Sequence, residues 1–151
     1  MRLSVTLLAV LTAVLATGCN TLNYSQYQVK GPVSEIGVRA TLSANDREAV
    51  KEIISAIAAQ YKLRDMTGSS LVPGTVAYYA QMDVDYPMEI KVYTTGGQIL
   101  VDVMQSNPGG ETSGFRQLRE TVLYELDQRF GSRVYVTPAT KLMREKPRQT
   151  Q

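Results

Sequence analysis

Acidic residues spaced closely enough to act together are the first candidates for chemistry in this chain. Asp83, Asp85 and Glu89 follow one another at short intervals, and Glu111 comes after a glycine pair further on. Carboxylate oxygens are the ligands that Ca²⁺ prefers. The stretch lacks the glycine and the closing glutamate of a calcium loop, so the pattern favours solvated acids at a turn. Glycosidases place two carboxyl groups across a cleft, and an enzyme of this kind acting on cell-wall glycans is an alternative hypothesis.

Residues 109–114, with the sequence Gly-Gly-Glu-Thr-Ser-Gly, precede an expected helix. The free backbone N–H groups at a helix start can hold an anion. A phosphate-binding loop also needs a Gly-Lys-Ser/Thr sequence, and no lysine lies there. Glu111 would moreover repel an anionic ligand. The segment is therefore interpreted as a loop that leads into a helix cap.

The chain contains no histidine. This removes the commonest metal ligand, the usual general base and any Ser-His or Cys-His nucleophile pair. The net charge of +2 gives no electrostatic case for a nucleic acid partner. The sequence thus predicts a non-catalytic protein without a cofactor or a metal ion.

The single cysteine, Cys19, ends an apolar N-terminal segment. Arg2 supplies a positive start, residues 3–15 are mostly apolar, and small residues lead to the cysteine in Ala16-Thr17-Gly18-Cys19. A transmembrane helix needs about 20 apolar residues, more than this run offers. Charge, apolar run and small residues are the parts of a signal peptide, so residues 1–18 are expected to be removed.

The Ala16-Thr17-Gly18-Cys19 segment resembles the lipobox of bacterial lipoproteins, over the N-terminal part of the chain alone. It departs from the commonest pattern because Ala16, not Leu, lies three places before Cys19. The resemblance implies that Cys19 carries acyl chains such as palmitate, which anchor the mature protein without a transmembrane helix. Asn20 stands where Asp would retain an enterobacterial lipoprotein in the inner membrane, so the outer membrane is implied. The alternative is a secreted protein whose Cys19 lies near the cleavage point by chance.

Four tyrosines give the best candidate for an interaction surface. Tyr78, Tyr79, Tyr86 and Tyr93 lie on or beside two expected strands. Tyr79 and Tyr93 are expected to point away from the apolar face, and exposed aromatic side chains often mark a binding surface. These two residues are therefore the predicted partner surface. Cross-strand packing without a ligand is the alternative.

The elements that must position these residues follow from hydrophobic periodicity. Alternating residues from Glu35 to Leu42 predict a half-buried strand. Apolar residues at helical spacing predict a helix that begins near Asn45, with Glu48 as its capping partner, and ends near Leu63. A second strand is expected over residues 76–84.

A hairpin over residues 88–105 is the best-specified part of the chain. Gly96-Gly97 suits a two-residue turn, and the resulting register places Lys91 opposite Asp102. The residues that then share the apolar face are Met88, Ile90, Val92, Ile99, Val101 and Val103.

A second helix is expected to follow the hairpin. It begins near Thr112 or Ser113, carries an apolar stripe from Phe115 to Phe130 and ends at Gly131. Residues 133–137 predict a short last strand.

The order strand, helix, three strands, helix, strand predicts one α+β domain. Two amphipathic helices on one face of a mostly antiparallel sheet, in a two-layer sandwich, bury both apolar stripes. The expected boundaries are a lipidated N-terminus and polar tether over residues 19–33, the domain over 34–138, and a basic tail over 139–151 with Lys141, Arg144, Lys146 and Arg148.

Together these features predict a non-catalytic lipoprotein anchored to the outer membrane and facing the periplasm. Such a protein would bind a protein partner or assist an envelope assembly. A small lipid- or glycan-binding module of the envelope is the alternative.

Overall fold

The computed structural model describes residues 22–137, and these form ten elements. In chain order they are β1 (Leu22–Val29), α2 (Ala44–Gln60), β2 (Arg64–Asp65), the 3₁₀ turn η1 (Thr67–Ser69), β3 (Thr75–Ala80), β4 (Met88–Thr95), β5 (Gln98–Ser106), α3 (Ser113–Phe130), the 3₁₀ turn η2 (Gly131–Arg133) and β6 (Val134–Val136).

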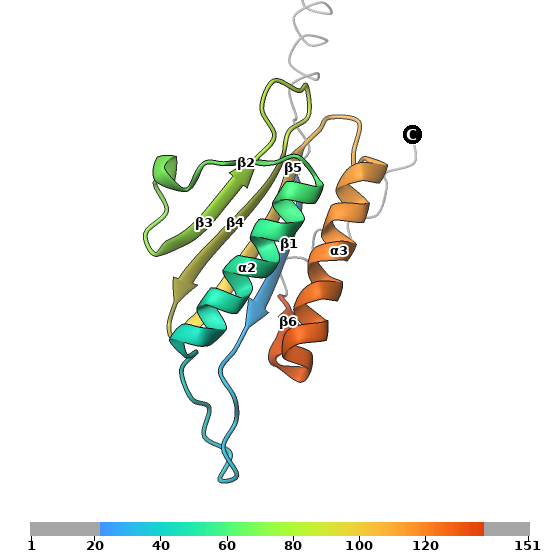
Figure 1. The fold of residues 1–151 in the computed structure, drawn as a ribbon. Helices are drawn as coiled ribbons and strands as arrows, with labels where there is room; N and C mark the ends of the chain where they lie inside the picture. The colour runs from blue at the N-terminus through green and yellow to red at the C-terminus, as the bar shows by residue number, and fades with distance from the viewer. Residues whose placement is uncertain (1–21, 138–151) are drawn as a thin grey trace, which may run out of the picture.

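The elements form two layers. One is a six-stranded sheet in the order β2-β3-β4-β5-β1-β6, with all neighbours antiparallel. The other consists of α2 and α3, which lie side by side on one face of the sheet (Figure 1). The predicted α+β sandwich is therefore confirmed. The two-residue strand β2 is one addition to the expected elements, and the first strand differs in position from the expected one, as described below.

The hairpin of β4 and β5 has the predicted register. Lys91 pairs with Asp102 and Thr95 pairs with Gln98. Gly96 and Gly97 both have positive φ, at 54° and 76°, which glycine adopts without steric cost. The turn thus fixes the register, and the predicted apolar face of the hairpin is buried.

The core lies between the sheet and the two helices. Each fully buried Ile, Leu, Val or Phe side chain contributes about 1.5–3 kcal/mol relative to exposure. The largest fully buried side chains are Tyr27, Phe115, Ile54, Ile90, Ile99, Leu118 and Leu126. Both helix stripes that the sequence indicates therefore face the sheet.

Side-chain caps begin both helices. The Ser43 hydroxyl accepts a hydrogen bond of 3.0 Å from the Asp46 backbone N–H, and the Asp46 carboxylate accepts one of 3.4 Å from the Ser43 N–H. This capping box replaces the expected pair of Asn45 and Glu48. Thr112 caps α3, as one of the two predicted positions, and Gly131 ends it with φ of 52°.

Strand β1 overturns the expectation of a polar tether over residues 19–33. Its 8 residues pair with β5 along their whole length, and Tyr27 and Val29 are fully buried under the helices. The glutamines at positions 26 and 28 alternate with them and face the other side of the sheet. The polar composition of β1 therefore reflects the face that points away from α2 and α3, and the described domain includes Leu22 and does not start at residue 34.

The strand predicted over residues 35–42 is wrong. Residues 31–41 form a loop that extends beyond the sheet between β1 and α2 (Figure 1). Among the residues expected to alternate in a strand, only Leu42 is buried. Alternation alone does not bury one face of a segment, because burial also needs neighbouring strands. In this sheet the strand that pairs with β5 is β1, and not residues 35–42.

No helix within residues 22–137 combines the length and the apolar character that crossing a bilayer requires.

Candidate functional site

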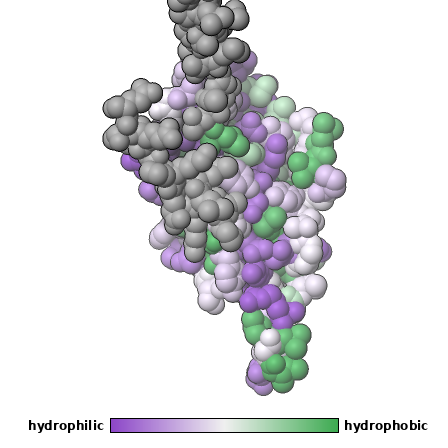
Figure 2. Space-filling view, turned by 180° about the vertical axis from the view of Figure 1, so that it is seen from behind, coloured by the Kyte–Doolittle hydropathy of each residue, from purple (hydrophilic) through white to green (hydrophobic). Residues whose placement is uncertain are grey.

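Loop 31–41 presents apolar side chains to solvent at its tip. Val33, Ile36 and Val38 are between 53% and 85% exposed. Figure 2 shows apolar residues gathered at the lower end of the molecule, where this loop projects from the domain. Apolar groups that are exposed together, beyond the body of a domain, are typical of a surface that binds another molecule.

The tip has a defined backbone conformation. Val33 and Arg39 form an antiparallel bridge, and the Ser34 N–H donates to the Val38 carbonyl at 2.8 Å. Gly37 turns the chain with φ of 79°, and its N–H donates to the Ser34 carbonyl at 2.9 Å. The apolar side chains are thus carried on a small hydrogen-bonded turn.

The base of the loop is closed by a glycine. A Cβ at Gly31 would lie 1.8 Å from the carbonyl oxygen of Ala40, which no side chain could accommodate without moving the backbone. The Ala40 N–H also donates to the Pro32 carbonyl at 2.9 Å. The two arms of the loop therefore approach closely because residue 31 has no side chain.

Contacts from the base fix the loop to the sheet. The Leu42 N–H donates to the Gly97 carbonyl at 3.0 Å. The Arg39 guanidinium donates to the Tyr135 hydroxyl at 3.2 Å, and the Lys30 ammonium lies 4.2 Å from the centre of the same ring. A loop held in this way loses little conformational entropy on binding, so its exposed apolar groups are preorganised for a partner.

The sheet face that points away from α2 and α3 carries a second cluster, made of Tyr24, Gln26, Tyr93 and Asp102 on three neighbouring strands. Asp102 accepts hydrogen bonds of 2.8 Å from the Tyr24 hydroxyl and from the Gln26 amide. The Gln26 amide also donates to the Tyr24 and Tyr93 hydroxyls at 2.8 and 3.1 Å. We call these four residues the polar network.

Charge and burial in the polar network disfavour ionisation of its tyrosines. Burial raises the pKa of Tyr24, and the hydrogen bond to the Asp102 carboxylate raises it further. Burial and the negative charge of Asp102 raise the pKa of Tyr93 to about 12. Both hydroxyls therefore remain neutral donors at physiological pH, and neither is poised to act as a base.

A related group lies beside the polar network on the same face. The Tyr78 hydroxyl donates to Glu89 at 3.0 Å, and the Lys91 ammonium lies 4.6 Å from the centre of the Tyr78 ring and 3.9 Å from Glu89. Burial and the Glu89 carboxylate raise the pKa of Tyr78. These polar groups satisfy one another across strands, which favours a role in holding the sheet together.

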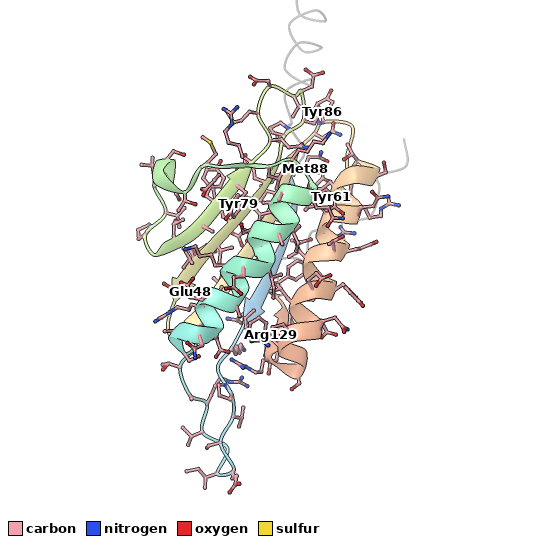
Figure 3. All side chains as sticks on the ribbon, in the orientation of Figure 1. Glu48, Tyr61, Tyr79, Tyr86, Met88 and Arg129 are labelled. Carbon is pink, nitrogen blue, oxygen red and sulfur yellow. The ribbon has the colours of Figure 1, made fainter. Side chains whose placement is uncertain are left out.

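The two tyrosines of the predicted partner surface do not share a face. Tyr93 lies on the sheet face that points away from the helices, whereas Tyr79 is only 7% exposed and lies beside α2 (Figure 3). There Tyr79 lines a hollow of about 430 Å³. Pairing explains the difference, because Tyr79 is opposite Ile90, which faces the helices. Tyr78, expected on the inner face, lies outside instead, so the assignment of faces in β3 was wrong.

The acidic residues considered for chemistry have separate surroundings. Asp83 and Asp85 are exposed in the loop between β3 and β4. Glu89 pairs with Lys91 as described, and Glu111 lies 2.7 Å from the Arg119 guanidinium. Within residues 22–137, no group of three or more acidic, histidine or cysteine side chains is placed to hold a metal ion.

Sequence reasoning missed the apolar tip and half of the polar network. Val33, Ile36 and Val38 were assigned to a tether and a strand, and Tyr24 and Gln26 to the tether. The alternation of Gln26, Tyr27, Gln28 and Val29 is the signal that indicates a strand there. For the tip, Gly37 is a turn-favouring residue within the expected strand, and Ser34, another such residue, directly precedes that strand.

Cys19, the signal peptide over residues 1–18 and the basic tail over 139–151 lie outside the described residues. The chain matches no known family model and no curated protein.

Proposed function

We propose that this chain is a non-catalytic lipoprotein, anchored to the outer membrane through Cys19 and facing the periplasm, that binds a protein partner through the tip of loop 31–41. The observation that carries the binding role is the exposure of Val33, Ile36 and Val38 on a loop with a fixed base. The lipobox resemblance at residues 16–19 supports the anchor.

The direction of the loop favours a protein over the anchoring bilayer as its partner. Leu22 follows Cys19 by only three positions, so an anchored chain enters the domain close to the lipid. From Leu22, β1 runs 8 residues toward the loop, about 26 Å at a strand's rise per residue. The tip therefore lies at the end of the domain opposite to the start of β1 (Figure 1).

The charge of the tip also suits a protein groove. Glu35 lies between the apolar residues, Arg39 follows them, and the two carry opposite charges, so the tip is not selective for an anionic surface. Apolar side chains on a turn, rimmed by charges, resemble the centre and rim of a protein–protein interface. We expect the partner to offer an apolar pocket that receives Ile36.

The binding role is tested by crosslinking in intact cells with a photoreactive residue at Val38. We expect one dominant crosslinked protein, and we expect Ile36→Asp to reduce that product to background without lowering the unfolding midpoint. Leu71→Asp is the matched control, because Leu71 is an apolar residue of another loop and is 96% exposed. A crosslink that survives Ile36→Asp, or that Leu71→Asp removes equally, would contradict binding through the tip.

The anchor has a separate test. Cys19→Ala should release the protein from the membrane fraction. Retention of that variant in the membrane would contradict the lipoprotein assignment and leave the role of the tip to the crosslinking result.

A further inference from the structure

The end of the domain opposite to the tip carries its own exposed apolar side chains. Leu22, Met82, Val84 and Tyr86 are each between 42% and 49% exposed. Three of them belong to loop 81–87, which joins β3 to β4 at the upper end of the molecule, where Tyr86 is labelled (Figure 3). We call these four residues the upper apolar patch.

Strand pairing places Leu22 and loop 81–87 at the same edge. Leu22 pairs with Ser106 at the end of β5, and Met88, directly after the loop, pairs with Gln105. Since β5 lies between β1 and β4, the two parts of the patch are two strand spacings apart, about 10 Å. The Gln105 amide also donates to the Tyr86 carbonyl at 3.1 Å and ties the loop to β5.

The position of Cys19 in the sequence indicates which surface the upper apolar patch contacts. This step rests on the proposed function, in which Cys19 carries the acyl chains. Leu22 follows Cys19 by three positions, and an extended chain covers at most about 3.6 Å per residue. Leu22 therefore lies within about 11 Å of the anchor point, and loop 81–87 lies about 10 Å from Leu22, so that the upper apolar patch is in reach of the headgroup layer.

We propose that the upper apolar patch rests in the headgroup layer of the membrane that holds the anchor, with Met82, Val84 and Tyr86 in contact with lipid. Tyrosine is favoured at this depth because its ring is apolar and its hydroxyl is polar. The contact adds to the acyl anchor and fixes the orientation of the domain. Loop 31–41 then points into the periplasm.

The charges of loop 81–87 determine which kind of lipid headgroup it contacts. Asp83 and Asp85 alternate with the apolar residues and are exposed. An anionic surface repels acidic side chains over about a Debye length. The contact is therefore made with zwitterionic lipid, and it weakens when anionic lipid replaces part of the surface.

Fluorescence quenching on vesicles tests this inference. The full-length lipidated protein, carrying Val84→Cys, is labelled with a polarity-sensitive thiol dye and reconstituted in phosphatidylethanolamine and phosphatidylcholine vesicles that contain a nitroxide-headgroup lipid. Ile36→Cys at the opposite tip is the matched control. Because Cys19 is the only cysteine of the chain, a lipidated protein takes up one dye, and mass spectrometry counts the dyes.

We expect at least twofold stronger quenching at position 84 than at position 36, and a smaller difference when phosphatidylglycerol is included. Equal quenching at both positions, with one dye per chain and the protein still on the vesicles, would overturn the membrane contact and leave the anchor intact. Two dyes per chain would show an unacylated Cys19, and in that case the proposed anchor fails together with the inference that rests on it.

Discussion

The Arg133 guanidinium donates a hydrogen bond of 2.7 Å to the Asp46 carboxylate, 87 positions away in the chain. Asp46 is also the carboxylate of the capping box that begins α2, and Arg133 donates in addition to the Lys30 carbonyl at 2.9 Å. This pair therefore joins the start of α2, the end of β1 and the turn after α3, next to the base of loop 31–41.

Ionisation of Asp46 should make the free energy of unfolding depend on pH in the acid range. The hydrogen bond from Arg133, followed by that from Ser43, holds the pKa of Asp46 below its ordinary value. A carboxyl whose pKa is lowered by folding stabilises the native state above its unfolded pKa of about 3.9, and this stability is lost as pH falls through the folded pKa. Urea unfolding of Asp46→Asn should show a smaller loss between pH 5 and pH 2 than the parent protein.

At pH 7 the same variant should be less stable by about 1–2 kcal/mol, because it loses both the ionised cap and the ion pair. Asp127→Asn, at an exposed position of α3, is the matched control and should stay within about 0.5 kcal/mol of the parent. If the unfolding free energies of Asp46→Asn and the parent fell in parallel as the pH decreased, the pair of Asp46 and Arg133 would not cause the loss of stability in acid.

Tyr93 should resist ionisation in alkali. Its pKa is raised to about 12 by burial and by Asp102, whereas an unfolded tyrosine ionises near pH 10. A group whose pKa is raised by folding contributes stability that is complete below its unfolded pKa and is lost as pH rises through the folded pKa. Tyr93→Phe should therefore reduce the fall in unfolding free energy above pH 10.

Absorbance titration of the phenolates checks the Tyr93 prediction. Tyr93→Phe should remove absorbance change near pH 12 and leave the transition near pH 10 unaltered. Loss of amplitude near pH 10 in Tyr93→Phe would contradict the raised pKa.

The hairpin was predictable because local chemistry fixes it. Gly96 and Gly97 allow a two-residue turn, and the turn leaves one register that also pairs Lys91 with Asp102. The helices were predictable for a similar reason, since their apolar stripes have an unambiguous period. The register of the hairpin and the buried faces of the helices can therefore be predicted from residues that are neighbours in the sequence.

The faces of β3 and the place of β1 depend on distant residues. A register shift between Thr75 and Ala77 sets which side of β3 faces the helices, and both sides contain tyrosine and alanine, so alternation does not choose between them. Strand β1 is an interior strand of the sheet because β5 and β6 pair with it. The same holds for the candidate site, because the exposure of Ile36 depends on where the other described elements lie rather than on the type of its own side chain.

Gly31 should be required for the shape of loop 31–41. Its Cβ position lies 1.8 Å from the Ala40 carbonyl oxygen, so Gly31→Ala must separate the two arms of the loop. Such backbone shifts cost about 1–3 kcal/mol. We expect the free energy of unfolding, measured in urea, to fall by this amount and the Val38 crosslink to be lost. Gly68→Ala, where nothing lies within 4 Å of the added Cβ, is the control. Similar stability of the two variants would contradict the close approach at the base.

The same substitution at two isoleucines should separate packing from binding. Ile54 in α2 is fully buried, and Ile54→Ala should lower the unfolding free energy by about 2–5 kcal/mol because it leaves a cavity. Ile36 at the tip has no packing to lose, so Ile36→Ala should remain within about 0.5 kcal/mol of the parent in urea unfolding.

If Ile36→Ala destabilised the domain as Ile54→Ala does, the tip would be part of the core and its exposure would carry no binding role. With stability unchanged, a loss of crosslinking in Ile36→Ala can only come from the interface itself. An exposed isoleucine that adds nothing to folding then has its physical explanation in the apolar surface of a partner.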